Sequence, residues 1–298
     1  MKLATKEIAD SHLGLPETQR RMIYERGERI SGVGFDYEST HKIWNRYCNL
    51  CRGTRFEPVC NFDRYGYKVP LVRCTGCHLR FINPRMSASE YDTFYLKHYR
   101  NLTKAYTGAE DPEQHLLSHQ QDMIKTIGPQ LTELQARSGA RYLDIGGGSG
   151  VKASMLAEMW NLDPHIIDPN ETEVEDAKKR GVHATLGRFE EYEGEPFDVI
   201  TLCQTVEHFL NPRAAFVKIG RLMKPNGVFI FDIIDFEERA RQWPLEQVAK
   251  VDHPFWFTPG TISEYVRLAN LDDMRPHDTF RYNTGHQIMY VCTSGRKW

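Results

Sequence analysis

The chain has 298 residues, of which 40% are hydrophobic and 11% aromatic, enough for one large domain and a smaller module. Its 38 Lys and Arg residues face 40 Asp and Glu residues, so a formal net charge of -2 directs it neither to nucleic acid nor to an anionic membrane. The N-terminus lacks the apolar core of a signal peptide and no later apolar run approaches bilayer length. A cytoplasmic protein without membrane insertion is expected.

The first half of the chain predicts three kinds of local structure in turn. Residues 16–40 predict a polar helix that begins at Pro16. Residues 48–84 carry short aromatic and β-branched runs separated by turn residues, which is typical of a small β module. Residues 87–138 have helical patterns, the first of them beginning at a serine cap.

From Arg141 onward, strand and helix patterns alternate. Strands are expected at 141–145, 165–168, 183–186, 197–202 and 228–234, and helices at 151–160, 171–181 and 212–223, the last followed by a turn at 224–227. Each strand is a nearly continuous apolar run, which favours a parallel sheet covered on both faces. A helix at 261–271 and a hairpin of strands at 277–283 and 286–294 complete the pattern.

The segment LDIGGGSG, from Leu143 to Gly150, joins the first of these strands to a helix. Ligands bind at such strand–turn–helix junctions, at the carboxyl ends of parallel strands. The third glycine of a dinucleotide fingerprint would fall on Val151 or Ala153, and no Lys-Ser/Thr pair completes a phosphate loop. What remains is D-x-G-x-G-x-G, formed by Asp144, Gly146, Gly148 and Gly150.

This motif resembles the first motif of class I S-adenosylmethionine (SAM) dependent methyltransferases, and the segments GRFEEY, FDVITLCQTVEHFLNP and LMKPNGVFIF continue the likeness in the family's order. The resemblance implies an α/β fold with a Rossmann-like methyltransferase sheet, mostly parallel with an antiparallel last strand. It also implies that an acidic strand end faces the cationic methionyl part of SAM and that Asp168, closing HIID, accepts both ribose hydroxyls. The residues expected to bind SAM are Asp144, Gly146, Gly148, Gly150, Asp168, Cys203 and Gln204.

Four of the seven cysteines form two C-x-x-C pairs, CNLC and CTGC, separated by 22 residues. Each pair places two thiolates on one tight turn, and two pairs complete a tetrahedral zinc site with no open position. We therefore expect Cys48, Cys51, Cys74 and Cys77 to bind a structural Zn²⁺, with His78 as a weaker alternative ligand. The alternative without a metal is that the four cysteines are free thiols in the core.

A zinc ribbon followed by LRFINPRMSASEYDTFY and then by the methyltransferase motifs resembles bacterial sugar C-methyltransferases and methyltransferases of polysaccharide gene clusters. Methyl transfer needs a positioned nucleophile and a base that removes its proton. The resemblance implies His253 as general base, His208 as the second choice, and Asp252 and Glu207 as orienting or hydroxyl-binding partners. In the sugar enzymes a tyrosine lies three positions before the second histidine, whereas this chain has Lys250 there.

The sequence thus predicts four parts: an N-terminal helical extension at 1–45, a zinc-binding β module at 46–86, a helical linker or acceptor-pocket region at 87–138, and a SAM-binding methyltransferase domain at 139–298. The expected function is methyl transfer from SAM to a small-molecule acceptor, a sugar or a nucleotide-sugar or polysaccharide component. Two alternatives stay open. One is an RNA methyltransferase with a zinc-binding module, disfavoured by the neutral charge; the other is a non-catalytic SAM-binding protein.

Overall fold

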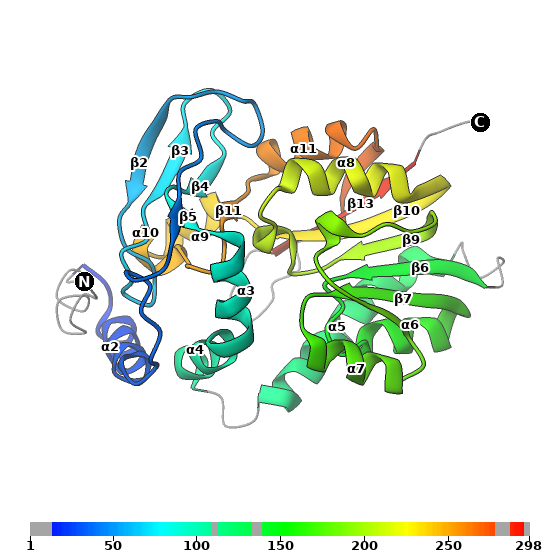
Figure 1. Ribbon diagram of the computed structural model, residues 1–298, viewed down its shortest axis with the longest axis horizontal. Helices are drawn as coiled ribbons and strands as arrows, with labels where there is room; N and C mark the ends of the chain where they lie inside the picture. Colours follow the sequence, from blue (N-terminus) through cyan, green and yellow to red (C-terminus); the bar gives the residue numbers. More distant parts are fainter. Residues whose placement is uncertain (1–13, 109–111, 133–138, 278–286, 295–298) are drawn as a thin grey trace. The chain divides into compact units, whose positions relative to one another are not determined.

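The structure is a computed structural model that describes residues 14–108, 112–132, 139–277 and 287–294. The chain forms two compact units (Figure 1). The cysteine unit contains Met1–Pro112 and Asp235–Thr258, and the sheet unit contains Glu113–Ile234 and Pro259–Trp298. The predicted strand at 277–283 lies, apart from His277, outside the described residues.

The sheet unit is built on seven strands in the order β12-β13-β10-β9-β6-β7-β8. Strands β6 to β10 are mutually parallel, β13 is antiparallel to β10, and β12 is antiparallel to β13. The predicted Rossmann-like methyltransferase sheet with its antiparallel last strand is therefore confirmed. The strands are β6 (Ala140–Ile145), β7 (Leu162–Asp168), β8 (His183–Leu186), β9 (Phe197–Leu202), β10 (Met223–Ile234), β12 (Asp272–His277) and β13 (Gln287–Thr293).

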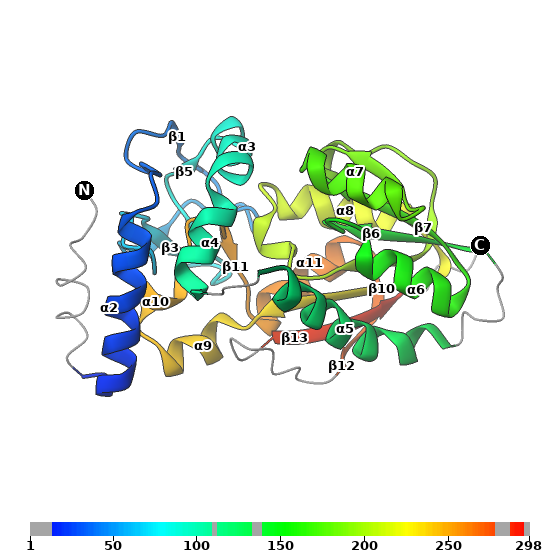
Figure 2. The same cartoon turned by 90° about the horizontal axis from the view of Figure 1, so that it is seen from below.

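Helices cover both faces of this sheet (Figures 1 and 2). On one face lie α5 (Pro112–Leu131), α6 (Val151–Trp160) and α7 (Glu171–Lys179), whose apolar side chains form one core with Tyr142 and Ile166. On the other face lie α8 (Pro212–Leu222) and α11 (Pro259–Leu268), where Phe216 packs on Phe229 and Tyr265. Two short 3-10 helices, η2 (Phe189–Glu191) and η3 (Val206–His208), flank β9.

The turn expected at 224–227, between the helix and the strand that follows it, is not a separate element. These residues lie inside β10, where the pairing with β9 shifts register between Met223 and Val228. Asn226 takes the left-handed conformation there, with φ of 57°, and its N–H donates to the carbonyl of Ser294 at 3.1 Å. The turn residues therefore form an irregularity within one long strand.

The cysteine unit has a four-stranded sheet in the order β11-β4-β3-β2 and a separate pair, β1-β5. Its strands are β1 (Lys42–Ile43), β2 (Phe56–Cys60), β3 (Leu71–Cys74), β4 (Arg80–Ile82), β5 (Arg85–Met86) and β11 (Phe255–Trp256). Its helices are α2 (Glu17–Ser31), α3 (Ala88–Lys97), α4 (Tyr99–Thr107), α9 (Phe236–Gln242) and α10 (Leu245–Val248). No helix in the described part of the chain is both long and apolar enough to cross a bilayer.

The segment 235–258 follows β10 in the chain but folds into the cysteine unit. Phe255 of β11 pairs with Phe81 of β4, and the N–H of Val251 donates to Oδ2 of Asp63 at 2.8 Å. Asp63 also accepts from the N–H groups of Tyr65 and Tyr67. The buried carboxylate thus ties Val251 to the loop at 63–67, and the N–H of Ile82 donates to the carbonyl of Pro254 at 2.9 Å, so these bonds hold the returning chain on the β module. The predicted four-part division stays a prediction. The contacts divide the chain differently, because they group residues 235–258 with residues 1–112.

Candidate functional site

The glycine turn between β6 and α6 requires glycine for two different reasons. Gly146, Gly148 and Gly150 all have positive φ, at 70°, 55° and 73°. A Cβ on Gly146 would lie 2.6 Å from Oγ1 of Thr205, and one on Gly150 would lie 2.8 Å from Cβ of Ala177. At Gly148 the nearest atom to a Cβ is Oε2 of Glu173, at 3.7 Å. Packing therefore excludes a side chain at two positions, while at Gly148 the described protein atoms leave room.

Asp168 lies at the carboxyl end of β7, beside this turn. Its Oδ2 accepts from the N–H of Gly148 at 3.0 Å, and its Oδ1 accepts from the N–H of Asn170 at 2.9 Å. Burial raises the pKa of Asp168 to about 6, so the group is mainly ionised at pH 7. Each oxygen keeps a lone pair, so the carboxylate can accept a pair of neighbouring hydroxyls. This geometry fits a ribose.

Asp144, at the end of β6, is fully buried and pairs with Lys152 of α6, whose Nζ lies 3.0 Å from its Oδ1. Thr201 also donates to Oδ1, at 2.7 Å. Oδ2 is buried without a hydrogen-bond partner among the described residues, and a Cβ on Gly147 would lie 3.1 Å from it. A buried acceptor beside the glycine turn fits a ligand that donates hydrogen bonds.

Lys152 was not expected at this site. Burial would lower the pKa of its ammonium, but the carboxylate of Asp144 raises it well above its usual range. The charge of Asp144 is thus already balanced within the protein, so attraction to a ligand cation is weaker than the sequence suggested. A lysine at the second position of a mostly apolar helix, eight residues after an acidic residue near the strand end, was the available signal.

Cys203 and Gln204 follow β9, the neighbour of β6. Cys203 is buried, and burial raises the pKa of its thiol to about 12, so it is neutral. Gln204 has a φ of 51°, and its N–H donates to Oδ1 of Asp232 at 2.6 Å. Burial raises the pKa of Asp232, a residue of β10 that the sequence did not single out, to about 6. The carboxyl ends of β6, β7, β9 and β10 thus bring the predicted cofactor residues to one edge of the sheet.

Glu207 and His208 lie in η3 of the sheet unit, just beyond this edge. Glu207 is buried, and its Oε1 accepts from the N–H of Ile234 at 3.1 Å, which fastens η3 to the end of β10. His208 is partly buried, and its N–H donates to the carbonyl of Thr205 at 3.0 Å. The Glu207 contact gives that side chain a structural role in addition to the predicted one.

Asp252 and His253 lie in the cysteine unit and are both buried. Lys250 joins them: its Nζ lies 2.6 Å from Nε2 of His253 and 3.1 Å from Oδ2 of Asp252. The same Nε2 lies 3.5 Å from Oδ2 of Asp252, so all three side chains meet at one point. An ammonium group only donates hydrogen bonds, so a protonated Lys250 requires Nε2 to accept. The backbone here is held by Tyr95, whose hydroxyl donates to the carbonyl of Asp252 at 3.0 Å. The residue that departs from the sugar enzymes is therefore part of the cluster.

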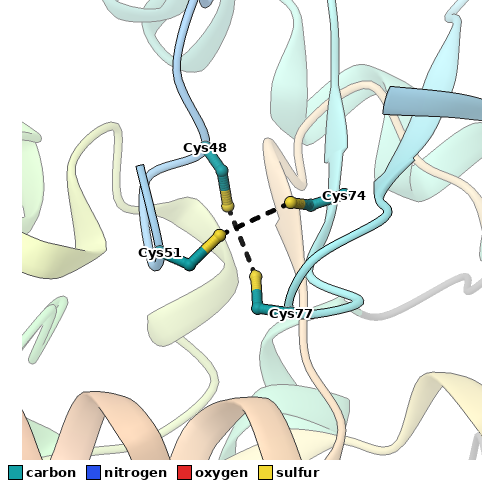
Figure 3. Close-up of side chains that lie close together, drawn as sticks. All are labelled: Cys48, Cys51, Cys74 and Cys77. Atoms are coloured by element: carbon teal, nitrogen blue, oxygen red, sulfur yellow. Dashed lines mark hydrogen bonds between the residues drawn. The ribbon is translucent and has the colours of Figure 1, made fainter. Parts of the chain in front are cut away.

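The four expected metal ligands converge from two turns of the β module (Figure 3). Their Sγ atoms lie within 4.8 Å of one another, with 3.5 Å between Cys48 and Cys77 and 3.5 Å between Cys51 and Cys74. A tetrahedral site with Zn–S bonds of about 2.3 Å has sulfurs roughly 3.8 Å apart. The observed spacing is close to that value.

The chemistry of the cluster also fits a cation. The hydrogen bond with Cys48 and then burial raise the pKa of the Cys77 thiol above its usual range. Without a metal the thiol therefore keeps its proton, and a thiolate is favoured there only when a cation lies among the four sulfurs. His78 has a φ of 64°, and its N–H donates to the carbonyl of Cys74 at 2.9 Å. Its backbone therefore shapes the turn, and its ring is not a member of the four-sulfur cluster.

Comparisons with known proteins agree on one family. A family profile described as "Methyltransferase domain" matches residues 115–275, which is over half of the chain. The ubiquinone biosynthesis O-methyltransferase of Neisseria meningitidis serogroup A is 30% identical over 178 residues, covering 52% of this chain and 73% of that protein. The mitochondrial enzyme of the same name from Schizosaccharomyces pombe is 24% identical over 224 residues, covering 70% and 77%.

Solved structures resemble the chain more weakly. An S-adenosylmethionine-dependent methyltransferase from Clostridium acetobutylicum matches with a TM-score of 0.45 and 14% identity, over 58% of this chain and 90% of that one. Phosphoethanolamine N-methyltransferase 2 of Haemonchus contortus, in complex with S-adenosyl-L-methionine, matches with a TM-score of 0.43 and 17% identity, over 53% and 49%.

Proposed function

Because this chain belongs to the methyltransferase-domain family, we propose that it transfers the methyl group of SAM to a small molecule that carries a sugar. The family makes the chain a SAM-dependent methyltransferase, and the acceptor is the part that we propose. The observation that supports cofactor use most directly is the carboxylate of Asp168, held by the N–H of Gly148 with lone pairs left for two hydroxyls.

We assign cofactor binding to the edge of the sheet formed by the glycine turn, Asp168 and Gln204. SAM supplies an electrophilic methyl group when it is bound. Asp168 accepts the ribose hydroxyls, the open space at Gly148 admits the ligand against the backbone, and Oδ2 of Asp144 accepts from the methionyl amine. Asp144 acts here as a hydrogen-bond acceptor, since Lys152 balances its charge.

We keep His253 as the proposed general base, with Asp252 orienting it, and add Lys250 to the cluster. Nε2 of His253 faces the ammonium of Lys250 at 2.6 Å. A proton from the acceptor therefore reaches Nε2 only if Lys250 moves aside or passes a proton on. His208 stays the second choice of base, and Glu207 stays a proposed orienting or hydroxyl-binding partner.

Zinc is proposed as a structural metal of the cysteine unit. Four sulfurs fill a tetrahedral coordination sphere and leave no position for a water or substrate. Its role is accordingly to hold the two turns of the β module together, separate from the methyl transfer.

A second candidate acceptor is a phenolic hydroxyl, favoured by the 30% identity to the Neisseria ubiquinone biosynthesis O-methyltransferase. A methyl-tritium SAM transfer screen over nucleotide sugars, glycans, catechol-type phenols and RNA separates the candidates. Label on a sugar-containing acceptor supports the proposal, and label on phenols or RNA alone overturns it. Calorimetry with S-adenosylhomocysteine and NAD tests the cofactor independently, since binding of NAD alone contradicts the proposed site.

A further inference from the structure

Two histidines and an aspartate lie together on neighbouring strands of the sheet unit. Asp163 and His165 are in β7, and His183 begins β8, where it is paired with His165 in the parallel ladder. Residues two apart in a strand point to the same face of a sheet, and residues paired across a ladder share a face as well. The three side chains are therefore neighbours on one face of the sheet.

The other face of these two strands is apolar. Ile166 of β7 and Ala184 of β8 pack in the core that the sheet forms with α5, α6 and α7. On the histidine face, the rings of His165 and His183 stack with their centroids 4.7 Å apart and 27° between their planes. His165 also makes a T-shaped contact with Phe197, at 5.3 Å between ring centroids. These contacts hold the His165 ring in one orientation.

The polar atoms of the three side chains converge. Nε2 of His165 lies 3.0 Å from Oδ2 of Asp163, and Nε2 of His183 lies 3.4 Å from Oδ1. One ligand atom from each residue lies within 4.8 Å of the other two. Ligands bound at about 2.0–2.1 Å to a tetrahedral Zn²⁺ are roughly 3.3 Å apart, so the two shorter distances bracket that separation. The side chain of His183 is 68% exposed, so its ring has room to turn toward a shared ion.

Arg141 of β6 is a positive group beside this cluster. Its Nε lies 3.8 Å from Oδ2 of Asp163. Other partners hold the guanidinium at the side of the cluster, since Nη1 donates to the carbonyl of Pro196 at 3.1 Å and Cζ lies 4.4 Å from the centre of the Phe197 ring. The charge of Asp163 is thus partly balanced already, and the convergence of three ligand atoms is what marks a metal site. The guanidinium repels a nearby cation, so binding should be weaker here than at the cysteine cluster.

We propose that Asp163, His165 and His183 bind a divalent transition-metal ion, with Zn²⁺ as the expected ion. Two imidazole nitrogens and a carboxylate oxygen suit Zn²⁺, whereas Mg²⁺ and Ca²⁺ prefer oxygen ligands alone. Three protein ligands leave one position of a tetrahedral ion for a water molecule. The ion joins the edge strand β8 to β7 and so stabilises this edge of the sheet.

The proposed site is separate from the cofactor residues and from the cysteine cluster. Asp163 is the second residue of β7 and Asp168 is the last, and five residues of extended strand span roughly 16 Å. The four cysteines belong to the other unit. The ion therefore has a stabilising role, and failure of the proposed methyl transfer leaves this site untouched.

The test is a metal titration of the full chain without an affinity tag, after the cysteine cluster has been saturated with Zn²⁺ and the excess removed. One further equivalent of Zn²⁺ should bind, as measured by calorimetry, and Mg²⁺ should bind far more weakly. Co²⁺ used as a spectroscopic probe should bind without thiolate charge-transfer absorption, because the ligands are nitrogen and oxygen atoms. This absence distinguishes the site from metal exchange at the cysteines.

Two ligand variants and one control decide the assignment. His183→Gln and Asp163→Asn should each weaken the binding of this further Zn²⁺ roughly tenfold or more, because each removes one of three ligands. His41→Gln changes an exposed histidine of the cysteine unit and should bind like the wild type. Circular dichroism confirms that each variant is folded, and His183 is exposed enough for its variant to fold. Three results overturn the inference: a wild type that binds no further Zn²⁺, unchanged affinity in either folded ligand variant, or Mg²⁺ that binds as tightly as Zn²⁺.

Discussion

Alanine substitutions at three glycines with positive φ separate cofactor contact from local packing. Gly148, Gly150 and Gly181 have φ values of 55°, 73° and 78°. An alanine forced into this left-handed region costs about 1–2 kcal/mol at each position. At Gly181 nothing lies within 4 Å of the added Cβ, so Gly181→Ala measures the backbone term by itself.

Gly150→Ala adds a steric conflict to this backbone term. Its Cβ would lie 2.8 Å from Cβ and 3.2 Å from Cα of Ala177, and backbone cannot move aside as a flexible side chain can. Overpacking of this kind costs about 1–3 kcal/mol. The free energy of unfolding of Gly150→Ala should therefore fall by about 2–5 kcal/mol, against about 1–2 kcal/mol for Gly148→Ala and Gly181→Ala.

Affinity for the cofactor should be lowered most in Gly148→Ala, which is not the variant that loses most stability. The Cβ of Gly148→Ala enters the space that we assign to SAM, and a misfit of about 1–3 kcal/mol weakens binding roughly 5- to 150-fold. Gly181→Ala should bind normally. Urea unfolding of the ligand-free protein measures stability, and calorimetry with S-adenosylhomocysteine measures affinity. Wild-type affinity in Gly148→Ala would refute the assigned cofactor position, and equal stability of Gly150→Ala and Gly181→Ala would refute the packing argument.

Three further predictions concern the metal, the base and the pH dependence. Cys51→Ser should remove the bound zinc and destabilise the cysteine unit, as measured by elemental analysis and thermal unfolding. A wild-type protein that contains no metal as purified and is as stable as the same protein with zinc added contradicts the zinc assignment. His253→Asn should lower turnover at least a hundredfold while S-adenosylhomocysteine affinity stays within about twofold of the wild type. Lys250→Met should displace the pH profile of turnover. Unchanged turnover in the first variant and an unchanged pH profile in the second eliminate Lys250, Asp252 and His253 from the reaction. Cofactor affinity should fall as the pH is lowered through about 6, where Asp168 takes up a proton and loses acceptor capacity. In the ligand-free protein the same raised pKa means that the native state binds more protons between pH 4 and 6, so the stability contributed by Asp168 falls as pH rises through that window; a pH-independent affinity contradicts the role of Asp168.

The features that were predicted from sequence depend on short stretches of chain. The alternation of strands and helices after Arg141 and the paired cysteine spacing each lie within local windows, and both are found in the structure. Parallel strands bring their carboxyl ends to one edge, so the motifs at Asp144 and Asp168 meet without further information. Local pattern and sheet topology together are enough for this part of the site.

The return of residues 235–258 to the cysteine unit depends on contacts that no local window contains. Val251 donates to Asp63 across 188 positions, and Phe255 pairs with Phe81. Neither contact has a periodic signature, because one is a backbone bond to a single buried carboxylate and the other joins a two-residue strand.

Lys250 shows how a departure from a family pattern gains meaning once its contacts are known. In the sequence, a lysine in place of tyrosine only weakens the likeness to the sugar enzymes. In the structure, its ammonium lies 2.6 Å from Nε2 of His253 and 3.1 Å from Oδ2 of Asp252. A tyrosine hydroxyl can both donate and accept a hydrogen bond, whereas an ammonium can only donate. With His253 as the proposed base, this difference changes which atom of the cluster can receive the proton. We therefore expect the route of proton removal to be where this chain differs from the sugar C-methyltransferases that its sequence resembles.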